Sequence, residues 1–471
     1  MTDQPLFSSL ELRPQLLNQL QHLGFIAMTP IQAAALPHVL TGADVVAQAS
    51  TGSGKTAAFG LGCLQHLQET KFHVQSLVLC PTRELADQVA NSFRSLAKNL
   101  ANTKIVTLCG GVAIGPQIGS LQHSAHIIVG TPGRVLKHLH KGTLHLHGLS
   151  SLVLDEADRM LDMGFADEID AILDFLPTPR QNLLFSATFP EEVAKVVAAL
   201  CPDAVRVDVT QTEAAPAIDE YWCHAPHRDL RGRTQVLGET LHHFGGKLNL
   251  VFCNTKHECA EVSRTLHQLG IGAVALHGDM EQQARSQTLV RFANGSANVL
   301  VATDVAARGL DIDDVGAVFN FELPHQVESY VHRIGRTGRS GRNGTAISLV
   351  SDREMSRLKL IETNLKHGAM RLWRADSSGS QGVETSAQPS LATPTVYTLE
   401  INGGRKQKLR PGDILGALTA GGILGADAVG KIDILPMVSY VAIAKEHTSA
   451  AQRLLNQHKI KGRQFRARGV G

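Results

Sequence analysis

The fold is decided by the stretch Ala49-Ser50-Thr51-Gly52-Ser53-Gly54-Lys55-Thr56, which follows an apolar run at 45–47 and precedes a helix-like segment. Small residues allow backbone N–H groups to curl around a phosphate, and a helix N-terminus behind them adds partial positive charge. Lys55 can then reach the β- and γ-phosphates, and the Thr56 hydroxyl can ligate Mg²⁺. The general motif begins with glycine where this chain has Ala49, and a plain Gly/Ser-rich turn is the alternative. The strand-loop-helix context favours a phosphate-binding loop.

The composition is that of a chain with several folded domains and no membrane segment. Its 471 residues suggest about three domains, and 43% of them are hydrophobic, enough for substantial cores. No apolar stretch approaches the roughly 20 residues that span a bilayer, and the first residues lack a signal-peptide pattern. The seven cysteines form no C-x-x-C pair, which indicates reduced thiols and not a metal site. We therefore expect a cytoplasmic protein.

The charge is divided unevenly along the chain. Residues 395–471 carry 12 Lys and Arg against 5 Asp and Glu, a net charge of +7. Residues 1–394 carry 33 against 38, a net charge of −5. A small basic module attached to a mildly acidic body indicates a polyanionic partner.

Two long stretches of the chain alternate short apolar runs with helix-like segments. In the first stretch the expected strands are Val45–Ala49, Ser76–Cys80, Lys104–Cys109, His126–Val129, Ser151–Leu154, Asn182–Phe185 and Val205–Val209. In the second they are Leu248–Phe252, Ala273–Leu276, Val299–Ala302, Ala317–Phe321 and Thr345–Val350. Nearly continuous Val, Ile and Leu in such runs is typical of strands covered on both faces, so each stretch predicts a parallel α/β sheet.

Changes in composition set the expected domain boundaries. They give a first α/β domain at 1–209, a linker at 210–218, a second α/β domain at 219–374, a flexible Ser/Gly/Pro-rich linker at 375–394 and a small domain at 395–471. The small domain has a βαββα pattern, with helices expected at Pro411–Thr419 and Thr448–Gln457 and a last strand near Gln464–Ala467. This pattern predicts an α+β fold like that of an RNA-recognition motif.

Acidic residues follow the fifth apolar run of the first domain, at Asp155-Glu156-Ala157-Asp158. Carboxylates at the end of a strand, beside a phosphate loop, suit Mg²⁺, which prefers oxygen ligands and keeps several waters. Asp155 is the candidate for holding the metal, largely through water, and Glu156 for orienting and deprotonating the attacking water. Simple capping of the next helix is the alternative for these residues.

The acidic stretch and the phosphate loop together resemble a DEAD-box ATP-dependent RNA helicase, and the resemblance extends across residues 1–370. Phe7, Gly24-Phe25 and Thr29-Pro30-Ile31-Gln32 match the Q motif of that family, in which the glutamine amide binds the adenine edge. The resemblance implies two tandem RecA-like domains, with ATP and Mg²⁺ as cofactors. The ATP contacts that it implies are Phe25, Gln32, the loop 49–56 and Asp304.

The same resemblance assigns the residues that couple and complete the reaction. Ser186-Ala187-Thr188 is similar to the motif that links the phosphate state to domain closure; by itself it would be a turn or cap. In His332–Arg339, the arginines Arg336 and Arg339 match the fingers that stabilise the transferring phosphoryl group. Arg333 is expected to brace the contact between the domains.

RNA contacts are implied by further matches to the family. In the first domain they are Pro81, Thr82, Arg83, Gly111, Thr131, Pro132, Gly133 and Arg134, and in the second Asn254, His277, Gly278, Arg285, Thr303 and Arg308. Short hydroxyls, glycine amides and arginines contact sugar and phosphate, so this surface is expected to bind without sequence preference.

The C-terminal segment resembles the RNA-binding domain of the bacterial DbpA subfamily, which acts on large-subunit (23S) ribosomal RNA. Its basic residues are expected to bind RNA, namely Arg405, Lys406, Lys408, Lys459, Lys461, Arg463 and Arg466. A solubilising end is the alternative reading of such a charge run. Tyr440 is the single aromatic residue in 435–441, where RNA-recognition motifs usually place several for stacking. A basic edge that grips a structured hairpin is therefore the better interpretation.

The combined interpretation is a monomeric ATP-dependent RNA helicase that unwinds short duplexes locally during ribosome assembly. A DNA translocase with the same nucleotide motifs is one alternative, disfavoured by the Q motif and the basic tail. An ATP-gated RNA clamp without unwinding activity is another, and strand-displacement assays distinguish it.

Overall fold

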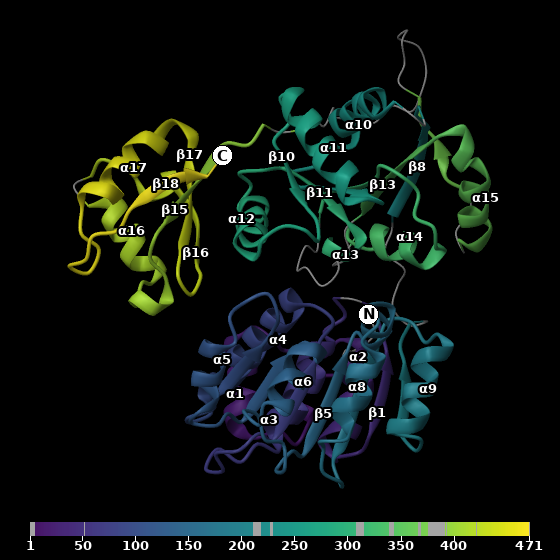
Figure 1. Cartoon of the computed structure of the whole chain (residues 1–471), viewed down its shortest axis with the longest axis vertical. Helices are drawn as coiled ribbons and strands as arrows, with labels where there is room; N and C mark the ends of the chain where they lie inside the picture. Colours follow the sequence, from purple (N-terminus) through teal and green to yellow (C-terminus); the bar gives the residue numbers. More distant parts are fainter. Residues whose placement is uncertain are drawn as a thin grey trace. The chain divides into compact units, whose positions relative to one another are not determined.

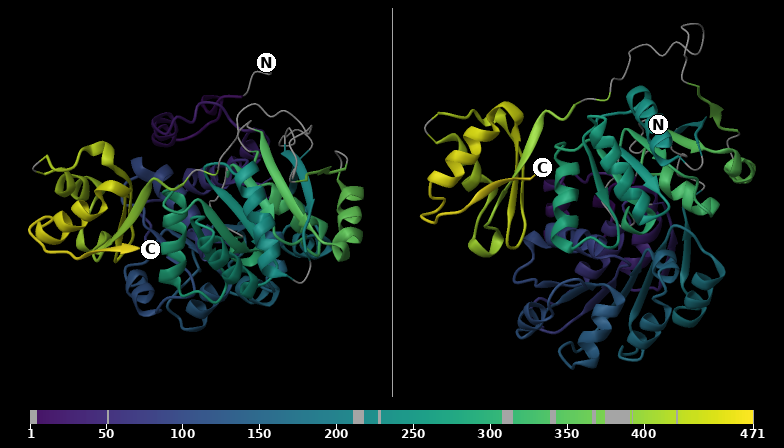
Figure 2. Two further views of the ribbon diagram at one scale, coloured as in Figure 1. Left: turned by 90° about the horizontal axis from the view of Figure 1, so that it is seen from above. Right: turned by 45° about the horizontal axis from the view of Figure 1, so that its top comes forward.

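A computed structural model describes residues 5–50, 52–210, 218–226, 229–307, 315–338, 343–365, 369–374, 391, 393–420 and 422–470 of the chain (Figures 1 and 2). Most of the expected linkers at 210–218 and 375–394 lie outside these residues. The fold class expected from the sequence is confirmed: two parallel α/β sheets and a smaller antiparallel sheet with helices.

The first domain contains a parallel sheet of seven strands in the described residues, in the order β3-β4-β2-β5-β6-β1-β7. The strands are β1 (Val45–Gln48), β2 (Ser76–Leu79), β3 (Ile105–Leu108), β4 (Ile127–Gly130), β5 (Ser151–Asp155), β6 (Gln181–Ser186) and β7 (Val205–Asp208). The helices are α1 (Pro14–His22), α2 (Pro30–Leu40), α3 (Lys55–Gln65), α4 (Arg83–Leu96), α5 (Gly115–Leu121), α6 (Pro132–His140), α7 (Ala157–Asp162), α8 (Ala166–Leu173) and α9 (Glu191–Leu200). All seven expected strands form, each within two residues of its expected ends.

The apolar runs form strands because both of their faces are buried. In β1, Val45 and Ala47 belong to one hydrophobic core, and Val46 belongs to the other. Helices pack on each side, with Phe59 of α3 and Phe93 of α4 in the first core. Such burial on two sides removes the alternation of apolar and polar residues that a half-exposed strand would show.

The second domain repeats this design, with the strand order β10-β11-β9-β12-β13-β8-β14. The strands are β8 (Ile218–His224), β9 (Asn249–Cys253), β10 (Ala273–Leu276), β11 (Val299–Thr303), β12 (Ala317–Asn320), β13 (Gly344–Val350) and β14 (Arg371–Leu372). The helices are α10 (Leu230–Phe244), α11 (Lys256–Gln268), α12 (Gln282–Ala293), α13 (Asp304–Ala307), α14 (Val327–Ile334) and α15 (Met355–Asn364).

Two strands of this sheet, β8 and β14, were not expected. β8 has the sequence Ile-Asp-Glu-Tyr-Trp-Cys-His. Because it mixes polar and apolar residues, the sequence does not distinguish this strand from the linker before it. It begins at Ile218, so the expected linker of 210–218 was one residue too long. The linker expected at 375–394 also needs correction, because Leu391 is buried in the hydrophobic core of the second domain.

The C-terminal domain is a four-stranded antiparallel sheet in the order β16-β17-β15-β18, with its helices on one face (Figure 2). Its elements are β15 (Val396–Ile401), α16 (Pro411–Thr419), β16 (Val429–Ile434), β17 (Ser439–Ala444), α17 (Thr448–Gln457) and β18 (Ala467–Val470). Both helices begin and end at the expected residues. The last strand starts at Ala467, where the expected strand ended, because the backbone of Arg466 and Ala467 bonds to asparagine side chains.

Short 3-10 turns connect several of these elements. They are Phe7–Ser9, Ala97–Asn99, Asp352–Glu354, Arg405–Gln407, Ala426–Ala428 and Lys445–His447. Over the described part of the chain, the helices are too short or too polar to cross a bilayer.

Candidate active site

The loop after β1 has the conformation that a phosphate-binding loop requires. Gly52 and Gly54 have φ values of +83° and +95°, which side chains other than glycine rarely adopt. Lys55 begins α3, and its buried ammonium Nζ donates to the carbonyl oxygen of Ala49 at 3.0 Å, so it lies across the loop. The Ser53 hydroxyl donates to the carbonyl oxygen of Ser50 at 2.7 Å. Thr51 lies outside the described residues.

The Q-motif glutamine is fixed against this loop. Gln32 Nε2 donates to the carbonyl oxygen of Gly54 at 3.1 Å, and its Oε1 accepts from the backbone N–H of Thr29 at 2.9 Å. A Cβ at Gly54 would collide with that Gln32 amide, so glycine is needed for spacing as well as for conformation. Phe25 is 44% exposed, as a residue that stacks on a ligand would be. The structure therefore brings the predicted adenine and phosphate contacts together.

The acidic stretch begins at the last residue of β5, which β6 separates from β1 and the phosphate loop. Asp155 is buried, and burial raises its pKa from 3.8 to about 7, against the opposing charge of Lys55. Glu156 has a left-handed backbone with a φ of +54°, and its carboxylate forms a 2.6 Å ion pair with Arg159. A buried carboxylate beside a lysine at the phosphate loop suits a hydrated Mg²⁺, whose charge would restore the ionised form of Asp155.

Asp158 joins the acidic stretch to the predicted coupling motif. Its Oδ2 accepts from the backbone N–H and the hydroxyl of Thr188, at 2.9 and 2.8 Å. The Ser186 hydroxyl accepts from the N–H of Asp158 and donates to the carbonyl oxygen of Thr188. Burial raises the pKa of Asp158, but the bonds from Thr188 and the charge of Arg159 outweigh it and hold the pKa below its ordinary value. These bonds tie the Ser186–Thr188 turn to the acidic stretch, and the coupling role of the turn stays a prediction.

The order of the strands separates two groups of predicted residues along one edge of the first sheet. The ends of β1, β5 and β6 lie side by side and carry the nucleotide residues. The ends of β3, β4 and β2 form the other half of the edge and carry the RNA residues. Arg134 ties this second half together, because it donates to Gln117 at 2.9 Å and to the carbonyl oxygen of Val112 at 2.8 Å. Thr82 caps α4 by accepting from the N–H of Leu85.

In the second domain, the predicted RNA residues again follow neighbouring strands, β10, β11 and β9. Arg285 donates to the carbonyl oxygen of His277 at 3.4 Å, so these two predicted contacts adjoin. Asn254 donates to the carbonyl oxygen of Leu323 at 3.1 Å. Arg336 is 5% exposed, and its role as a finger stays a prediction. Arg308 and Arg339 lie outside the described residues.

The expectation that Arg333 braces the contact between the domains stays a prediction. In the described residues its guanidinium is 1% exposed and binds groups of its own domain. It donates to both carboxylate oxygens of Asp304, at 2.7 and 2.6 Å, and to Asn254 at 2.8 Å. The ring of Phe252 lies 5.1 Å below it. Both carboxylate oxygens of Asp304 thus accept hydrogen bonds from Arg333. The contact of Asp304 with the nucleotide stays a prediction.

Three supporting residues were not predicted from the sequence as part of the site. They are Asp158, which holds Thr188, Arg159, which pairs with Glu156, and Gln117, which binds Arg134. Asp158 is the last residue of the acidic stretch 155–158, so its position in the sequence could have indicated that it belongs to the site. Gln117 lies in α5, 17 residues from Arg134 in α6, and nothing in the local sequence connects them.

In the C-terminal domain, the two basic segments predicted to bind RNA lie next to each other. Lys461 Nζ donates to the carbonyl oxygen of Lys408 at 3.0 Å and pairs with Asp413 at 2.7 Å. Tyr440 is fully buried, and its hydroxyl donates to Glu400 at 3.2 Å. It is therefore unavailable for stacking on a base, which agrees with the expectation that the sheet is not a stacking platform.

The raised pKa of Asp155 predicts a pH-dependent stability when divalent cations are absent. A carboxyl whose folded pKa (about 7) exceeds its ordinary 3.8 stabilises the fold fully below 3.8, and this contribution falls as pH rises toward 7. Asp155→Asn should therefore stabilise the first domain more at pH 8 than at pH 5, by at most about 3 kcal/mol, because only the two pH units between 5 and 7 contribute. Hydrogen exchange of the β5 amides measures this. Asp174→Asn, an exposed aspartate beside α8, is the control, and an equal effect of Asp155→Asn at both pH values would contradict the assignment.

Two tandem parallel-sheet domains, with a phosphate loop and an acidic strand end in the first, define a nucleotide-hydrolysing motor core. Residues 29–196 match the DEAD/DEAH box helicase family, residues 232–341 the helicase conserved C-terminal domain, and residues 398–468 the DbpA RNA binding domain. The chain is 50% identical over 465 residues to ATP-dependent RNA helicase DbpA of Escherichia coli, covering 98% of this chain and 99% of that one.

More distant relatives share the core alone. DEAD-box ATP-dependent RNA helicase CshA of Bacillus cereus is 43% identical over 78% of this chain and 69% of its own length. The structure of Saccharomyces cerevisiae Dbp5 bound to RNA and ADP BeF3 superposes with a TM-score of 0.70 at 31% identity, over 78% of this chain and 95% of that one. The chain therefore belongs to the DEAD-box family of ATP-dependent RNA helicases, and within it to the DbpA subfamily.

Proposed function

We propose that this helicase couples Mg²⁺-dependent ATP hydrolysis to local, non-processive unwinding of RNA, and that its C-terminal domain directs it to 23S ribosomal RNA during ribosome assembly in the cytoplasm. One observation carries the core of this proposal. The predicted nucleotide residues and RNA residues occupy the two halves of one sheet edge, and β5 of the nucleotide half pairs directly with β2 of the RNA half. A chain in which Asp158 connects the acidic motif to Thr188 has a direct path by which phosphate state can alter the domain.

In this mechanism the chain's own residues divide the work. Lys55 and the loop amides hold the phosphates, Gln32 selects adenine, and Glu156 orients and deprotonates the attacking water. The buried Asp155 and Thr56 would hold hydrated Mg²⁺, which would neutralise phosphate charge. Arg336 and Arg339 would complete the site from the second domain when ATP and RNA close the clamp. Closure around one strand bends it and displaces its partner, and hydrolysis releases it.

The C-terminal domain supplies selectivity that the core lacks. Its net charge of +7 and its two adjoining basic segments fit a polyanion, and the core's predicted contacts go to sugar and phosphate. The Escherichia coli relative, which this chain matches over 99% of that relative's length, is named as an ATP-dependent RNA helicase. We propose that the domain recognises a structured element of 23S ribosomal RNA and that the protein acts as a monomer.

Truncation after Pro394 tests the targeting role. It keeps Leu391, which is buried in the second domain, and removes the whole C-terminal sheet. We expect basal ATP hydrolysis with generic single-stranded RNA to stay within about twofold, while the preference for 23S ribosomal RNA is lost. The preference should be lost because truncation removes the basic C-terminal segments, whose contacts with phosphates are strongly salt-dependent. ATPase activity against 23S RNA and a poly-uridine control measures it, and an unchanged preference would refute the role.

The same assays address the two alternatives. Stimulation by DNA as strong as that by RNA would support a DNA translocase. ATP-dependent RNA binding without release of a displaced strand would support a clamp.

A further inference from the structure

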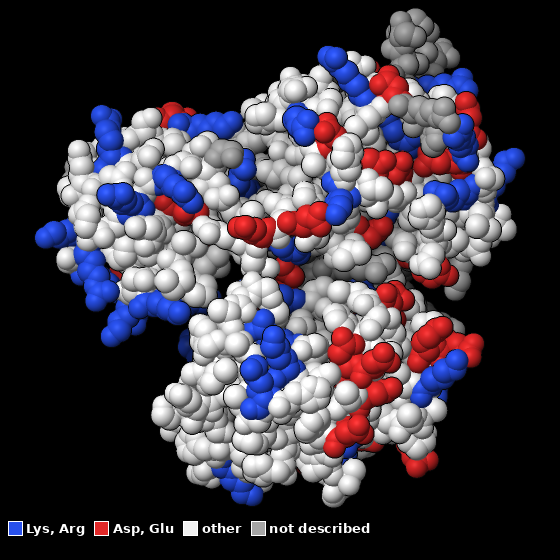
Figure 3. Space-filling model, viewed as in Figure 1, with Lys and Arg blue, Asp and Glu red and all other residues white. Residues whose placement is uncertain are grey.

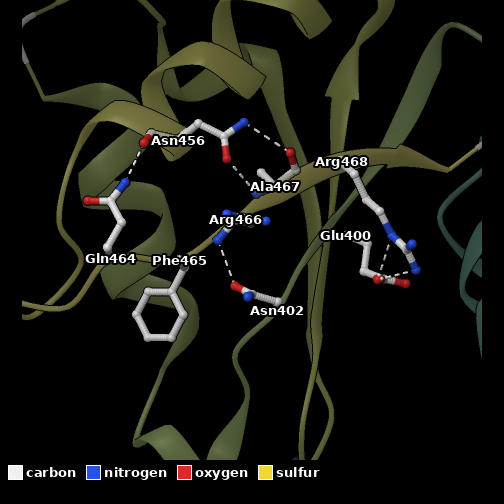
Figure 4. A pocket seen from close by; sticks show the side chains of 8 residues that line it. All are labelled: Glu400, Asn402, Asn456, Gln464, Phe465, Arg466, Ala467 and Arg468. Carbon is white, nitrogen blue, oxygen red and sulfur yellow. Dashed lines mark hydrogen bonds and ion pairs between the residues drawn. The ribbon is translucent and has the colours of Figure 1, made fainter.

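Two sets of hydrogen bonds hold predicted RNA-binding parts of the chain in place. One set lines a cavity of about 670 Å³ in the C-terminal domain, where side-chain amides bind the backbone beside the last strand (Figure 4). The other set lies in the first domain between α5 and α6, and it ends on a charged side chain, the guanidinium of Arg134. The second set therefore acts on a group that is itself predicted to contact RNA.

Gln117 is the centre of this second set. Its Nε2 donates to the carbonyl oxygen of Cys109 at 2.9 Å, so its Oε1 is an acceptor. That oxygen accepts from Nη1 of Arg134 at 2.9 Å and lies 3.0 Å from Nε2 of His138. Because Arg134 and His138 lie one turn apart in α6, both side chains are on the same face of the helix. One amide thus connects two side chains of α6 to the loop that follows β3.

The bonds of Gln117 decide which nitrogen of the His138 ring carries the proton. Because Oε1 of Gln117 can only accept, Nε2 of His138 must donate to it. Nδ1 of the neutral ring is then an acceptor, and the hydroxyl of Thr143 lies 2.8 Å from it. The ring is fully buried, and this burial, followed by the charges of Arg134 and Lys141, lowers its pKa and favours the neutral form. Both ring nitrogens are therefore occupied, and the orientation of the ring is fixed.

The same bonds leave part of the Arg134 guanidinium for a ligand. Its Nη2 donates to the carbonyl oxygen of Val112 at 2.8 Å, and together with the Gln117 bond this fixes the plane of the group. The remaining N–H groups of the guanidinium meet no acceptor in the described ranges of the chain. Basic side chains gather on the part of the first domain that carries α5 and α6, and acidic ones over α8 (Figure 3). A phosphate suits a fixed guanidinium in such surroundings.

We propose that His138 is a positioning residue for RNA binding, which acts through Gln117 to hold Arg134 in the orientation that binds an RNA phosphate. His138 is itself buried and does not reach the ligand. Without this chain of bonds the guanidinium could turn about its long side chain, and fixing it before RNA arrives lowers the entropy lost on binding. The inference rests on the proposed contact between Arg134 and RNA, and it adds two residues that the family resemblance did not assign.

The test measures ATP hydrolysis by the full-length protein over a range of poly-uridine concentrations, because this RNA reports the core without the preference for 23S ribosomal RNA. His138→Leu should raise the KM for poly-uridine about fivefold, the scale of one hydrogen bond, with kcat nearly unchanged. His138→Gln keeps an N–H group that can reach Gln117, so its KM should stay within about twofold of the original value.

A second pair of variants tests the other end of the same bond. Gln117→Leu should raise the KM for poly-uridine at least as much as His138→Leu, and it decides the question if His138→Leu does not fold. Gln122→Leu, which changes an exposed amide at the end of α5, is the matched control and should leave the KM unchanged.

A double variant separates positioning from a merely structural role. Arg134→Ala should raise the KM for poly-uridine about tenfold and lower the salt dependence of binding by about one phosphate contact. Adding His138→Leu to Arg134→Ala should raise the KM no further, because the group that His138 holds is already gone. An unchanged KM in His138→Leu, or an equal rise in both backgrounds, would overturn the positioning role and leave the contact of Arg134 intact. If Arg134→Ala changes neither the KM nor the salt dependence, the proposed RNA contact fails and the inference fails with it.

Discussion

Replacing Lys55 by alanine or Glu156 by glutamine is expected to reduce RNA-stimulated ATP hydrolysis by about 10²–10⁴-fold. The ammonium of Lys55 lies across the phosphate loop, 3.0 Å from the carbonyl oxygen of Ala49, and α3 contains no second lysine that could replace it. The carboxylate of Glu156 is 7% exposed and held by Arg159, so it has a fixed direction for orienting water. Without Lys55 the phosphates lose a positively charged partner, and without the Glu156 carboxylate the attacking water loses its general base.

The two variants should differ in how they fail. Lys55→Ala should weaken ATP binding as well as turnover, whereas Glu156→Gln keeps the shape of the side chain and should bind ATP nearly normally. Steady-state hydrolysis with saturating RNA and binding of a fluorescent ATP analogue separate these effects. Glu192→Gln, an exposed glutamate in the first turn of α9, is the matched control. Full turnover in Glu156→Gln would remove that residue from the reaction.

The sequence predicts the fold well where burial on two faces leaves a simple pattern. The strands of the first sheet are recognisable because Val, Ile and Leu fill both cores that Val45 and Val46 separate. β8 escapes recognition because its polar residues interrupt the apolar pattern, and pairing with β13 and β14 makes it a strand. Tertiary context, not local preference, decides such segments.

The sequence likewise predicts some features of the active site and misses others. Residues within one motif, such as Lys55 or Asp155, are identified by their neighbours in the chain. Contacts between motifs are not: the bonds from Thr188 to Asp158 join residues 30 apart, and the contacts of Arg333 reach 79 residues back to Asn254. For Arg333 beside the predicted fingers, the sequence suggests a role between the domains but carries no information on which side chains its guanidinium binds.

The buried pair of Arg333 and Asp304 leads to the second large prediction. Asp304→Ala should destabilise the second domain by about 3 kcal/mol, because it leaves a buried guanidinium without its carboxylate. The value belongs at the low end of the range for broken buried pairs. Asp304 is 26% exposed, and Asn254 and the carbonyl oxygen of Glu322 still accept from Arg333. Hydrogen exchange of the β11 and β12 amides should report the loss, while β5 in the first domain stays protected.

A comparison with Asp304→Asn and the double variant Asp304→Leu/Arg333→Met identifies what the carboxylate does. If it serves mainly to balance Arg333, the double variant should recover much of the stability, because removing both charges together removes the desolvation penalty. Asp304→Asn should then lose stability with little change in the KM for ATP. If instead Asp304 contacts the nucleotide, as the family resemblance implies, Asp304→Asn should raise that KM severalfold at full stability. A stable Asp304→Ala protein would show that the guanidinium is satisfied by its neutral partners, and that the pair is not what holds β11 and α14 together.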